Sequence, residues 1–352
     1  MLKDAIIDSA KLGGEGRTIY SETPLNTPAE EISGETERTL SLAIDDYGTL
    51  YYYRGNVTDN YVNFAGTCWR IVRIAGDESI KLILEDQNTT CESSNYTGNW
   101  SIGTGNFGYS ENLDDLNLIS NSKNNKKYEI KLLAPSIPDK QFYMNYLNSS
   151  NSSSMANNFQ NFQSNKLNDY LNNLKNGDWC LNDVAYNDET GTTKLSNSDK
   201  YNYYNNNTSF YYDSYVRLKG KTTKEPTLKC NGTNMSKFAN NINMYVGTLT
   251  VDEIVFAGGK FDYPNSNTNY YLINDYHQKN NLNFLSMTLV YFVYGSDVAL
   301  YIDEYGGIRE NGDDTYNFVS SVNNIRPAIN LKSNIQITGG AGTKENPYEI
   351  AS

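Results

Sequence analysis

The chain has 352 residues, a net charge of −12 and an isoelectric point near 4.7, a balance that argues against nucleic acid or anionic membrane surfaces as partners. No apolar run approaches the length that a bilayer-spanning helix needs, so we expect no membrane contact by this chain itself. Aromatic residues make up 13 % of the chain, with 30 tyrosines, and can supply a substantial core beneath a polar surface.

Residues 1–40 are expected to form an N-terminal arm or linker. Within it, residues 1–12 predict a short amphipathic helix, because Ile6, Ile7 and Leu12 fall near one side. The rest of the arm is rich in Gly, Pro, Glu, Ser and Thr, which is typical of an extended linker. No signal-peptide pattern is present, so if the protein is exported this chain is its mature or truncated part.

The most strand-like stretch runs over residues 47–85. Residues 69–74 are mostly β-branched or aromatic and alternate between two faces, which favours a strand. Residues 75–79 supply turn chemistry, and residues 80–85 alternate again as a return strand. A third strand is predicted at 50–53. Because one face of the first strand carries both apolar residues and arginines, we expect it to be central in its sheet.

Two helices are predicted farther along the chain. Residues 166–174 place apolar side chains at the i, i+3, i+4, i+7 spacing of an amphipathic helix, with Gly177 as a stop. Thr250 is followed three residues later by Glu253, which is the spacing of a capping box. One helical turn that ends at Gly258 and Gly259 is expected here.

The other elements are short strands and polar segments. Strands are predicted at 128–133, 210–218, 298–302 and 325–331, followed by a terminal hairpin over 335–350. Pro327 indicates an edge position or a bulge. Polar insertions at about 92–127 and 185–209 should decorate the domain, with a short helix at 142–147 and a mobile low-complexity run at 148–158.

Strand content and turn density predict an α+β, mainly antiparallel β fold for residues 41–352. A division into 41–135 and 160–352 is the alternative. The core sheet is expected to contain Trp69, Ile71, Ile80, Leu82, Leu300, Ile302, Ile329 and Leu331.

The chain has four cysteines, which allow three pairings. Sequence order favours Cys68 with Cys91 and Cys180 with Cys230. A zinc site is the rival interpretation, but no Cys-x-x-Cys motif occurs and His277 is the single histidine. Disulfides are therefore favoured, and they place the protein in an oxidising, extracytoplasmic space.

No coherent catalytic set emerges. A histidine-dependent site would have to use His277, whose neighbours at 274–280 predict a solvated loop and a surface side chain. Acidic clusters at 45–46, 111–115 and 310–314 offer oxygen ligands for calcium, but such runs are more often solvated turns and none has EF-hand spacing. We expect no cofactor and leave calcium open. Paired carboxylates for glycoside hydrolysis also stay open.

Tyr- and Asn-rich segments at 201–215 and 263–276 suit an adaptable binding surface. Codon bias with ordinary core and edge tyrosines explains them equally well. The residues we expect to contact a ligand are Tyr271, Tyr291, Tyr294, Tyr301 and Arg326.

Six stretches taken together resemble one group of surface proteins from gut Firmicutes and Mollicutes, some of which carry prepilin-like or other hydrophobic N-terminal anchors. The stretches are residues 46–55, 60–66, 69–74, 247–259, 325–332 and 342–348. The group's closing layout is similar to modules with a C-type-lectin-like fold, and residues 284–288 stand where the group has its aromatic and Ser-Pro element. The resemblance implies a C-type-lectin-like variant of the predicted fold and no catalytic residue.

We therefore expect a non-catalytic, adhesin-like extracellular module that binds a glycan or protein on a host or neighbouring cell. One alternative is a pilin-like or other filament subunit, which would self-associate. The other is a secreted carbohydrate-active enzyme.

Overall fold

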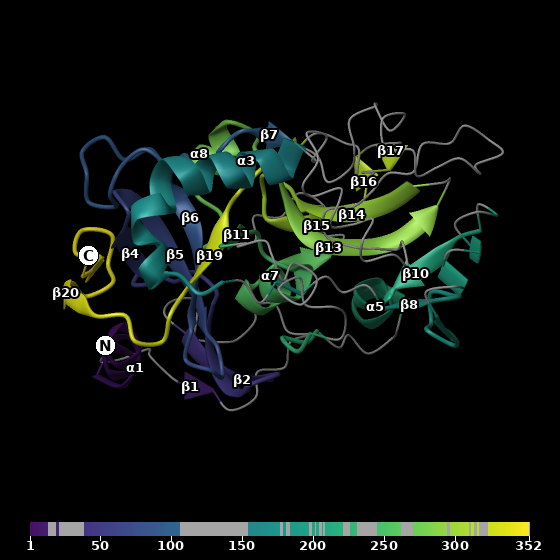
Figure 1. Cartoon of the computed structure of the whole chain (residues 1–352), viewed down its shortest axis with the longest axis horizontal. Coiled ribbons are helices and arrows are strands. Elements are labelled where there is room, and N and C mark those ends of the chain that lie inside the picture. The colour runs from purple at the N-terminus through teal and green to yellow at the C-terminus, as the bar shows by residue number, and fades with distance from the viewer. Residues whose placement is uncertain are drawn as a thin grey trace.

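In the computed structural model of this chain, two β-sheets lie side by side and share one hydrophobic core (Figure 1). The fold is α+β with mostly antiparallel sheets and short helices, as predicted. The structure describes residues 1–12, 19–20, 39–105, 154–176, 179–180, 184–196, 199–200, 202–203, 206, 208–220, 226–230, 245–261, 270–293, 296–309, 311–312, 315–316 and 323–351.

The first sheet is organised around β5 (Thr67–Ile74), which is central as predicted. It pairs with β3 (Gly48–Arg54), β4 (Tyr61–Phe64) and β6 (Ile80–Asp86), all antiparallel. The predicted hairpin of β5 and β6 is confirmed. The other strands of this sheet are β1 (Ile19–Tyr20), β2 (Thr39–Asp45), β11 (Val246–Gly247), β19 (Ala328–Leu331), β20 (Ile337–Gly339) and β21 (Tyr348–Ile350).

The β5–β6 turn lies against the β2–β3 turn, and a glycine makes this approach possible. A Cβ atom on Gly76 would lie 2.6 Å from both the Asp45 side chain and the Gly48 backbone nitrogen. The Gly76 N–H instead donates to Asp45 Oδ2 at 3.0 Å. The two hairpin tips are therefore joined.

Strand β19 is paired on both sides, with β6 and with β11. Pro327 comes immediately before its first residue, and the Pro327 carbonyl accepts from Leu84 N at 2.9 Å. The prediction that Pro327 marks an edge strand or a bulge is therefore wrong. A proline is tolerated there because its missing N–H falls outside the ladder.

The second sheet is built on the hairpin of β13 (Phe284–Val293) and β14 (Ser296–Ile302). Leu300 and Ile302 belong to it, so the residues expected in one core sheet are all buried but divide between two sheets. Its other strands are β7 (Thr104–Gly105), β8 (Ala185–Tyr186), β9 (Lys194–Leu195), β10 (Phe210–Tyr212), β12 (Lys260–Phe261), β15 (Gly307–Arg309) and β18 (Asn323–Asn324). A separate two-stranded sheet consists of β16 (Asn311–Gly312) and β17 (Thr315–Tyr316).

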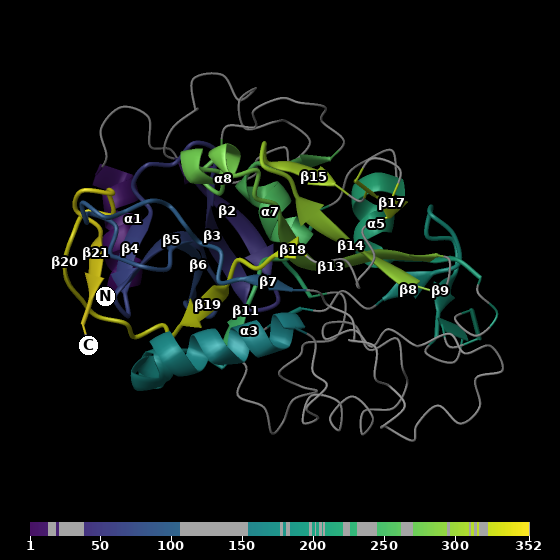
Figure 2. The ribbon, with the colours of Figure 1, turned by 90° about the horizontal axis from the view of Figure 1, so that it is seen from above.

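Helix α1 (Leu2–Leu12) confirms the predicted N-terminal helix, and it packs on the domain. Leu2, Ile6 and Ile7 are buried, and the Leu2 N–H donates to the Ile335 carbonyl at 2.9 Å. Figure 2 shows α1 beside the C-terminal strands β20 and β21. Strand β1 also pairs in parallel with β2, so this part of the expected arm is integrated in the sheet.

A long helical segment covers one face of the first sheet. It consists of α3 (Ser154–Phe162), a π-helical turn η3 (Gln163–Leu167) and a 3-10 turn η4 (Asn168–Asn173). The Phe162 ring packs 6.1 Å from the Trp69 ring. The helix predicted at 166–174 is therefore real, but tertiary packing extends it upstream and tightens its last turns.

Two local predictions meet other elements in the structure. The run at 148–158, expected to be mobile, overlaps α3 at residues 154–158, and its first six residues lie outside the described part of the chain. The strand predicted at 210–218 stops at Tyr212 and continues as α5 (Asp213–Tyr215) and η5 (Val216–Gly220). Arg217 pairs with Asp213 one helical turn away, which favours the helical backbone. The predicted elements at 128–133 and 142–147 lie outside the described residues, as does Gly177.

Helix α7 (Val251–Ala257) contacts β3 of the first sheet and β13 of the second. Its predicted capping box is present: Thr250 Oγ1 accepts from Glu253 N, and Glu253 Oε2 accepts from Thr250 N. The helix ends before Gly258 as expected, but its seven residues make it longer than the single turn predicted. The last helix is α8 (Asp275–Lys279).

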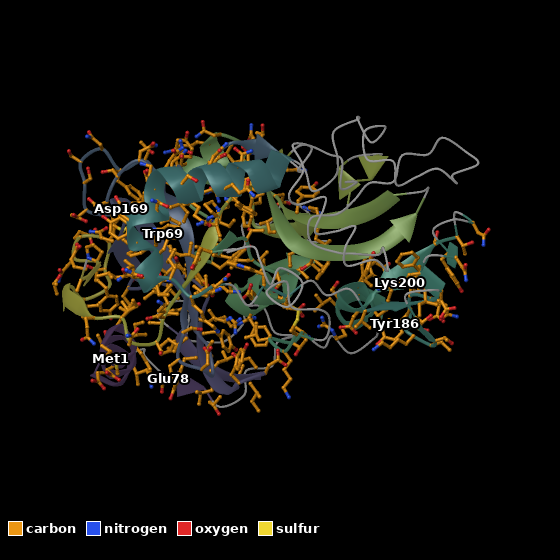
Figure 3. The ribbon with its side chains drawn as sticks, in the orientation of Figure 1. Met1, Trp69, Glu78, Asp169, Tyr186 and Lys200 are labelled. Atoms are coloured by element: carbon orange, nitrogen blue, oxygen red, sulfur yellow. A yellow bond between two sulfur atoms is a disulfide. The ribbon has the colours of Figure 1, made fainter. Side chains whose placement is uncertain are left out.

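Side chains fill the space between the elements of the first sheet and the helices that cover it (Figure 3). Met1 and Glu78 lie near one end of the molecule, whereas Tyr186 and Lys200 lie near the other. The terminal hairpin of β20 and β21 is confirmed. Among the helices that the structure describes, none combines the length and the apolar character needed to cross a membrane.

Candidate functional site

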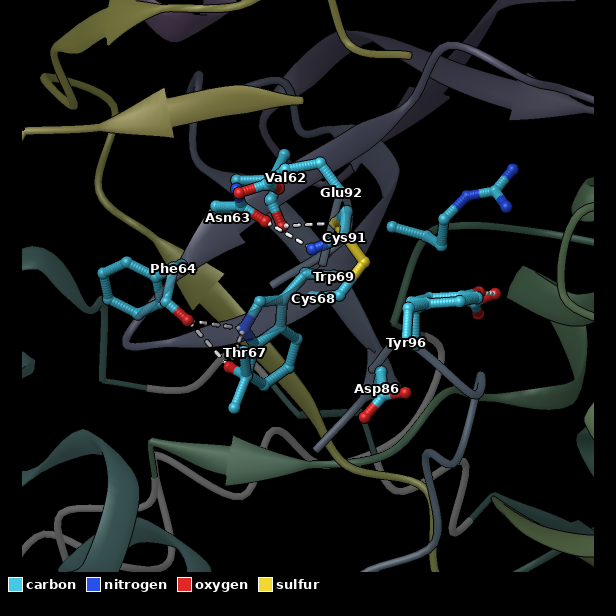
Figure 4. The surroundings of a disulfide bond; sticks show 12 residues. Val62, Asn63, Phe64, Thr67, Cys68, Trp69, Asp86, Cys91, Glu92 and Tyr96 are labelled. Carbon is cyan, nitrogen blue, oxygen red and sulfur yellow. Dashed lines mark hydrogen bonds between the residues drawn. A yellow bond between two sulfur atoms is a disulfide. The ribbon is translucent and has the colours of Figure 1, made fainter. Parts of the chain in front are cut away.

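Both predicted disulfides are present. Cys68 is bonded to Cys91, with Cα atoms 4.7 Å apart, and Cys180 to Cys230, with Cα atoms 5.4 Å apart. Figure 4 shows how the first bond ties β5 to the loop after β6, where the Cys91 N–H donates to Asn63 Oδ1 at 2.9 Å. No cysteine is left as a metal ligand, which excludes the cysteine-based zinc site.

The second disulfide borders a cavity between the first sheet and α7. Its volume of about 30 Å³ has room for about two water molecules. Charged and aromatic groups surround it. The lining residues are Arg73, Lys81, Trp179, Cys180, Thr227, Leu228, Lys229, Thr250, Asp252 and Glu253.

Glu253 is the electrostatic centre of this cavity. Its Oε1 accepts from Lys81 Nζ at 2.6 Å and from Arg73 Nε at 3.1 Å, and Arg73 Nη1 also donates to Asp45 Oδ2 at 3.1 Å. Burial by itself would raise the pKa of Glu253, but the Lys81 and Arg73 charges hold this pKa below its usual value. The carboxyl is therefore ionised.

A second buried pair joins α7 to the segment after β10. Arg217 donates from Nη1 to Asp252 Oδ1 at 2.6 Å and from Nη2 to Asp252 Oδ2 at 3.1 Å, and its Nε donates to Asp213 Oδ2 at 2.5 Å. Burial lowers the pKa of Arg217, but the two carboxylates raise it above its usual value. Such a two-pronged contact is geometrically specific and fixes α5 and η5 on α7.

Arg326 forms a third buried cluster. Its Nη2 donates to Glu85 Oε2 at 2.9 Å and its Nε to the Leu84 carbonyl at 2.8 Å. The other carboxylate oxygen of Glu85 accepts from Tyr96 Oη at 2.8 Å and from Asn274 Nδ2 at 3.0 Å. Both charges are thus surrounded by hydrogen bonds, which is what a buried ion pair requires.

His277 was expected on a solvated loop, and that expectation is wrong. It lies in α8, fully buried, with its ring 5.1 Å from the Trp100 ring and 5.9 Å from the Phe284 ring. Neither ring nitrogen has a hydrogen-bond partner. Burial, with a smaller effect of the Arg326 charge, lowers the pKa of His277 to about 3. The ring is neutral and packed among aromatic side chains, an environment that suits a core residue.

Of the five residues predicted to contact a ligand, the structure describes the side chains of three. Tyr271 and Arg326 are buried in the core, and Tyr301 is half-buried in β14. Tyr291 belongs to β13, but its side chain is outside what the structure describes, and Tyr294 lies outside the described residues. Burial favours structural roles for Tyr271 and Arg326. Ligand binding by the set stays a prediction.

Sequence reasoning missed the charged groups of the cavity as a set. Lys81 and Arg73 were assigned to strands, and Glu253 only to a helix cap. A signal was present, because charged residues alternate with apolar ones inside the most strand-like stretch of the chain. Charges at such positions need buried partners.

Calcium stays open. No group of three or more His, Cys, Asp or Glu side chains is placed to hold a metal within the part of the chain that is described. Asp45 is already paired with Arg73, and Asp46 Oδ2 accepts from Cys230 N at 2.7 Å. The acidic cluster at 111–115 lies outside the described residues, as do the three acidic residues of 310–314.

Comparison with protein-family models, curated proteins and solved structures finds no match to this chain. The resemblance to Firmicutes and Mollicutes surface proteins therefore stays a prediction, as does the C-type-lectin-like variant of the fold. Three of its stretches do meet in space: residues 69–74 form most of β5, 247–259 contain α7, and 325–332 contain β19.

Proposed function

We propose that this protein is a non-catalytic extracellular module that binds a glycan or a protein on another cell. The observation that carries the proposal is the pair of disulfides. Structural disulfides form and persist in oxidising compartments and are rare in the cytosol. Both bonds here fasten loops to the sheet framework: one ties the loop after β6, and the other ties residues next to the charged cavity.

The tip of the β2–β3 hairpin is the described element best suited to contact a ligand. Ile44 is 60 % exposed and Tyr47 is 51 % exposed. A tyrosine offers a rigid, amphipathic contact surface at a small entropic cost. Lys175 Nζ lies 4.9 Å from the centre of the Tyr47 ring, and the Tyr47 N–H donates to Asp45 Oδ1 at 2.8 Å. The tip is therefore held in place before a ligand arrives.

The same tip is connected to the second disulfide. Asp46 accepts a hydrogen bond from the Cys230 backbone at 2.7 Å, while Asp45 is held by Arg73. Reduction of the Cys180–Cys230 bond should therefore loosen the contact surface. The cavity beneath holds only about two waters, so a sugar or peptide would bind on this surface and not inside the cavity.

A glycan array and a screen of host surface proteins test the proposal. The wild type is compared with a double variant, Ile44→Ser with Tyr47→Ser. The matched control is Tyr305→Ser, because Tyr305 is also exposed but follows β14 in the second sheet. We expect ligands that bind the wild type and the control but not the double variant. No ligand in either screen would contradict the proposal.

A pilin-like or filament subunit is the second candidate, and α1 is the observation that favours it. This helix is docked on the β-rich domain through Leu2 and Ile6, as an N-terminal helix leading out of a globular head would be. Electron microscopy of cells that express the complete gene tests this idea. Filaments labelled by antibodies to this chain would support it, and a complete gene without an apolar segment upstream would remove it.

A further inference from the structure

Three chemically complementary side chains meet under the first sheet. Lys81 comes from β6, Glu253 from α7 and Asn330 from β19. The side chains of Lys81 and Glu253 are 4 % and 3 % exposed, and Lys81 Nζ donates to Glu253 Oε1 at 2.6 Å. A lysine is rarely buried so completely, and here its amine donates a hydrogen bond directly to a carboxylate.

Asn330 is the direct cross-strand partner of Lys81. The two residues lie opposite each other in the antiparallel register of β6 and β19, so their side chains share one face with Cβ atoms roughly 5 Å apart. Asn330 is buried, and its Nδ2 has no hydrogen-bond partner. An unpaired buried amide is costly and calls for an explanation.

Trp179 covers the same face. Lys81 Nζ lies 5.0 Å from the centre of its ring. A Cβ atom on Gly247 would lie 2.7 Å from the same ring, and Gly247 is opposite Ala328, which shares a face of β19 with Asn330. The indole therefore shields the lysine and the asparagine from water.

We propose that Lys81 and Asn330 condense into an intramolecular isopeptide bond, with Glu253 as the group that moves the protons. This is a covalent modification that goes beyond the proposed function and does not depend on it. The required groups are an amine, a carboxamide and a carboxylate in one buried site. The amine and the carboxylate are hydrogen-bonded, and the carboxamide belongs to the residue opposite the lysine in the sheet register.

The reaction balances without any other reactant. Glu253 accepts one proton from the Lys81 ammonium, and the neutral Nζ attacks Cγ of Asn330 to form a new C–N bond. The attacking nitrogen gives up a second proton, and the bond between Cγ and Nδ2 of Asn330 breaks. Nδ2 takes up the two protons that Nζ released and leaves as ammonium, and Glu253 returns to a carboxylate. Glu253 Oε1 lies 2.6 Å from Nζ, within reach of the proton that must leave, and fixed proximity replaces a collision between separate molecules.

Such a bond would link a strand early in the chain to a strand late in the chain. Strand β6 precedes nearly all of the second sheet in sequence, and β19 follows it. A covalent link between them would hold the first sheet together even if the second sheet opened. Resistance to pulling and to proteolysis would follow.

Mass spectrometry of the purified full chain tests the proposal. After reduction and alkylation, the measured mass of the intact wild type should be lower, by one molecule of ammonia, than the mass calculated for the alkylated sequence. Digestion should yield a branched species that joins the peptides containing Lys81 and Asn330. In Glu253→Gln the full sequence mass should return, because the proton acceptor is lost while both reacting side chains remain.

Asparagine can also lose ammonia by cyclising to a succinimide, and two controls separate the two products. Lys81→Arg prevents the isopeptide bond but not a succinimide, so its mass should return to the full value. Absence of the branched species from the wild type would overturn the proposal. An ammonia loss that persists in Lys81→Arg, with no branched species formed, would also overturn it. The branched species is sought in the wild type itself, so the test remains decisive even if a variant fails to fold.

Discussion

Arg326 and Glu85 form an ion pair of 2.9 Å in which both side chains are at most 1 % exposed. Arg326 comes just before β19 and Glu85 lies in β6, so the pair fastens two neighbouring segments of the first sheet from within the core. Tyr96 and Asn274 bond to the same carboxylate. This contact gives Arg326 a structural role.

Replacing Arg326 with Met should strongly destabilise the fold. The change leaves the Glu85 charge buried without its partner, and breaking a buried pair in this way costs about 3–5 kcal/mol. Urea denaturation followed by tyrosine and tryptophan fluorescence measures the loss. The double variant Arg326→Met with Glu85→Gln should lose less than the sum of the two single variants, because the charges compensate each other.

Lys279→Met is the matched surface control for this experiment. Its contact with Asp275 is 3.8 Å long and both side chains are largely exposed, so little change in stability is expected. If Arg326→Met were as mild as this control, the buried pair would not have the role assigned to it.

Stability should fall as the pH drops from about 6.5 towards 3, in part because of His277. Its pKa is lowered to about 3 in the folded chain, whereas an unfolded histidine titrates near 6.5, so the unfolded state binds a proton that the folded state refuses. The stability is therefore complete above pH 6.5 and declines below it. Between pH 6.5 and 5 this single group should account for about 2 kcal/mol.

The variant His277→Phe isolates this contribution. A phenyl ring keeps the packing against Trp100 and Phe284 but cannot be protonated. Denaturation curves at pH 7 and pH 5 should show a smaller pH dependence for the variant than for the wild type. Equal pH dependence in the two proteins would show that His277 is protonated without cost. Buried carboxylates such as Glu253, whose pKa is lowered, add to the loss at more acidic pH.

Removing either disulfide should lower the free energy of unfolding. The Cys68–Cys91 bond closes a loop over a separation of 23 residues, for which chain entropy gives about 3 kcal/mol, and Cys180–Cys230 spans 50 residues, for about 4 kcal/mol. Paired Cys→Ser variants, compared in denaturant with and without a reducing agent, measure both values. The reducing agent should have no effect on a variant that lacks all four cysteines.

The capping box at the start of α7 can be tested without touching its charges. Thr250→Ala removes the hydroxyl that accepts from Glu253 N at 3.2 Å, and should cost about 1 kcal/mol. Thr250→Ser keeps the hydroxyl and should stay close to the wild type. A loss in the serine variant as large as in the alanine variant would assign the effect to the threonine methyl group.

Local patterns in the sequence were sufficient for several local elements. The alternation in residues 69–74 predicted β5, and the three-residue spacing of Thr250 and Glu253 predicted the cap of α7. The order of the cysteines was enough for both disulfides. The strand and the helix cap depend on residues that are close together along the chain, so their signal lies in spacing and residue type.

Only the tertiary structure decided where the buried polar groups go. Nothing near His277 in sequence shows that Trp100 will pack against it, and nothing near Lys81 shows that Glu253 and Asn330 will meet it. These contacts join segments that are far apart in the chain, and they depend on sheet register and on how α7 packs between the sheets. Composition and periodicity do not encode such pairings, because one buried charge can be satisfied by many partners. The sequence therefore determined many of the elements and the disulfide framework, and the packing of the sheets decided which polar side chains meet.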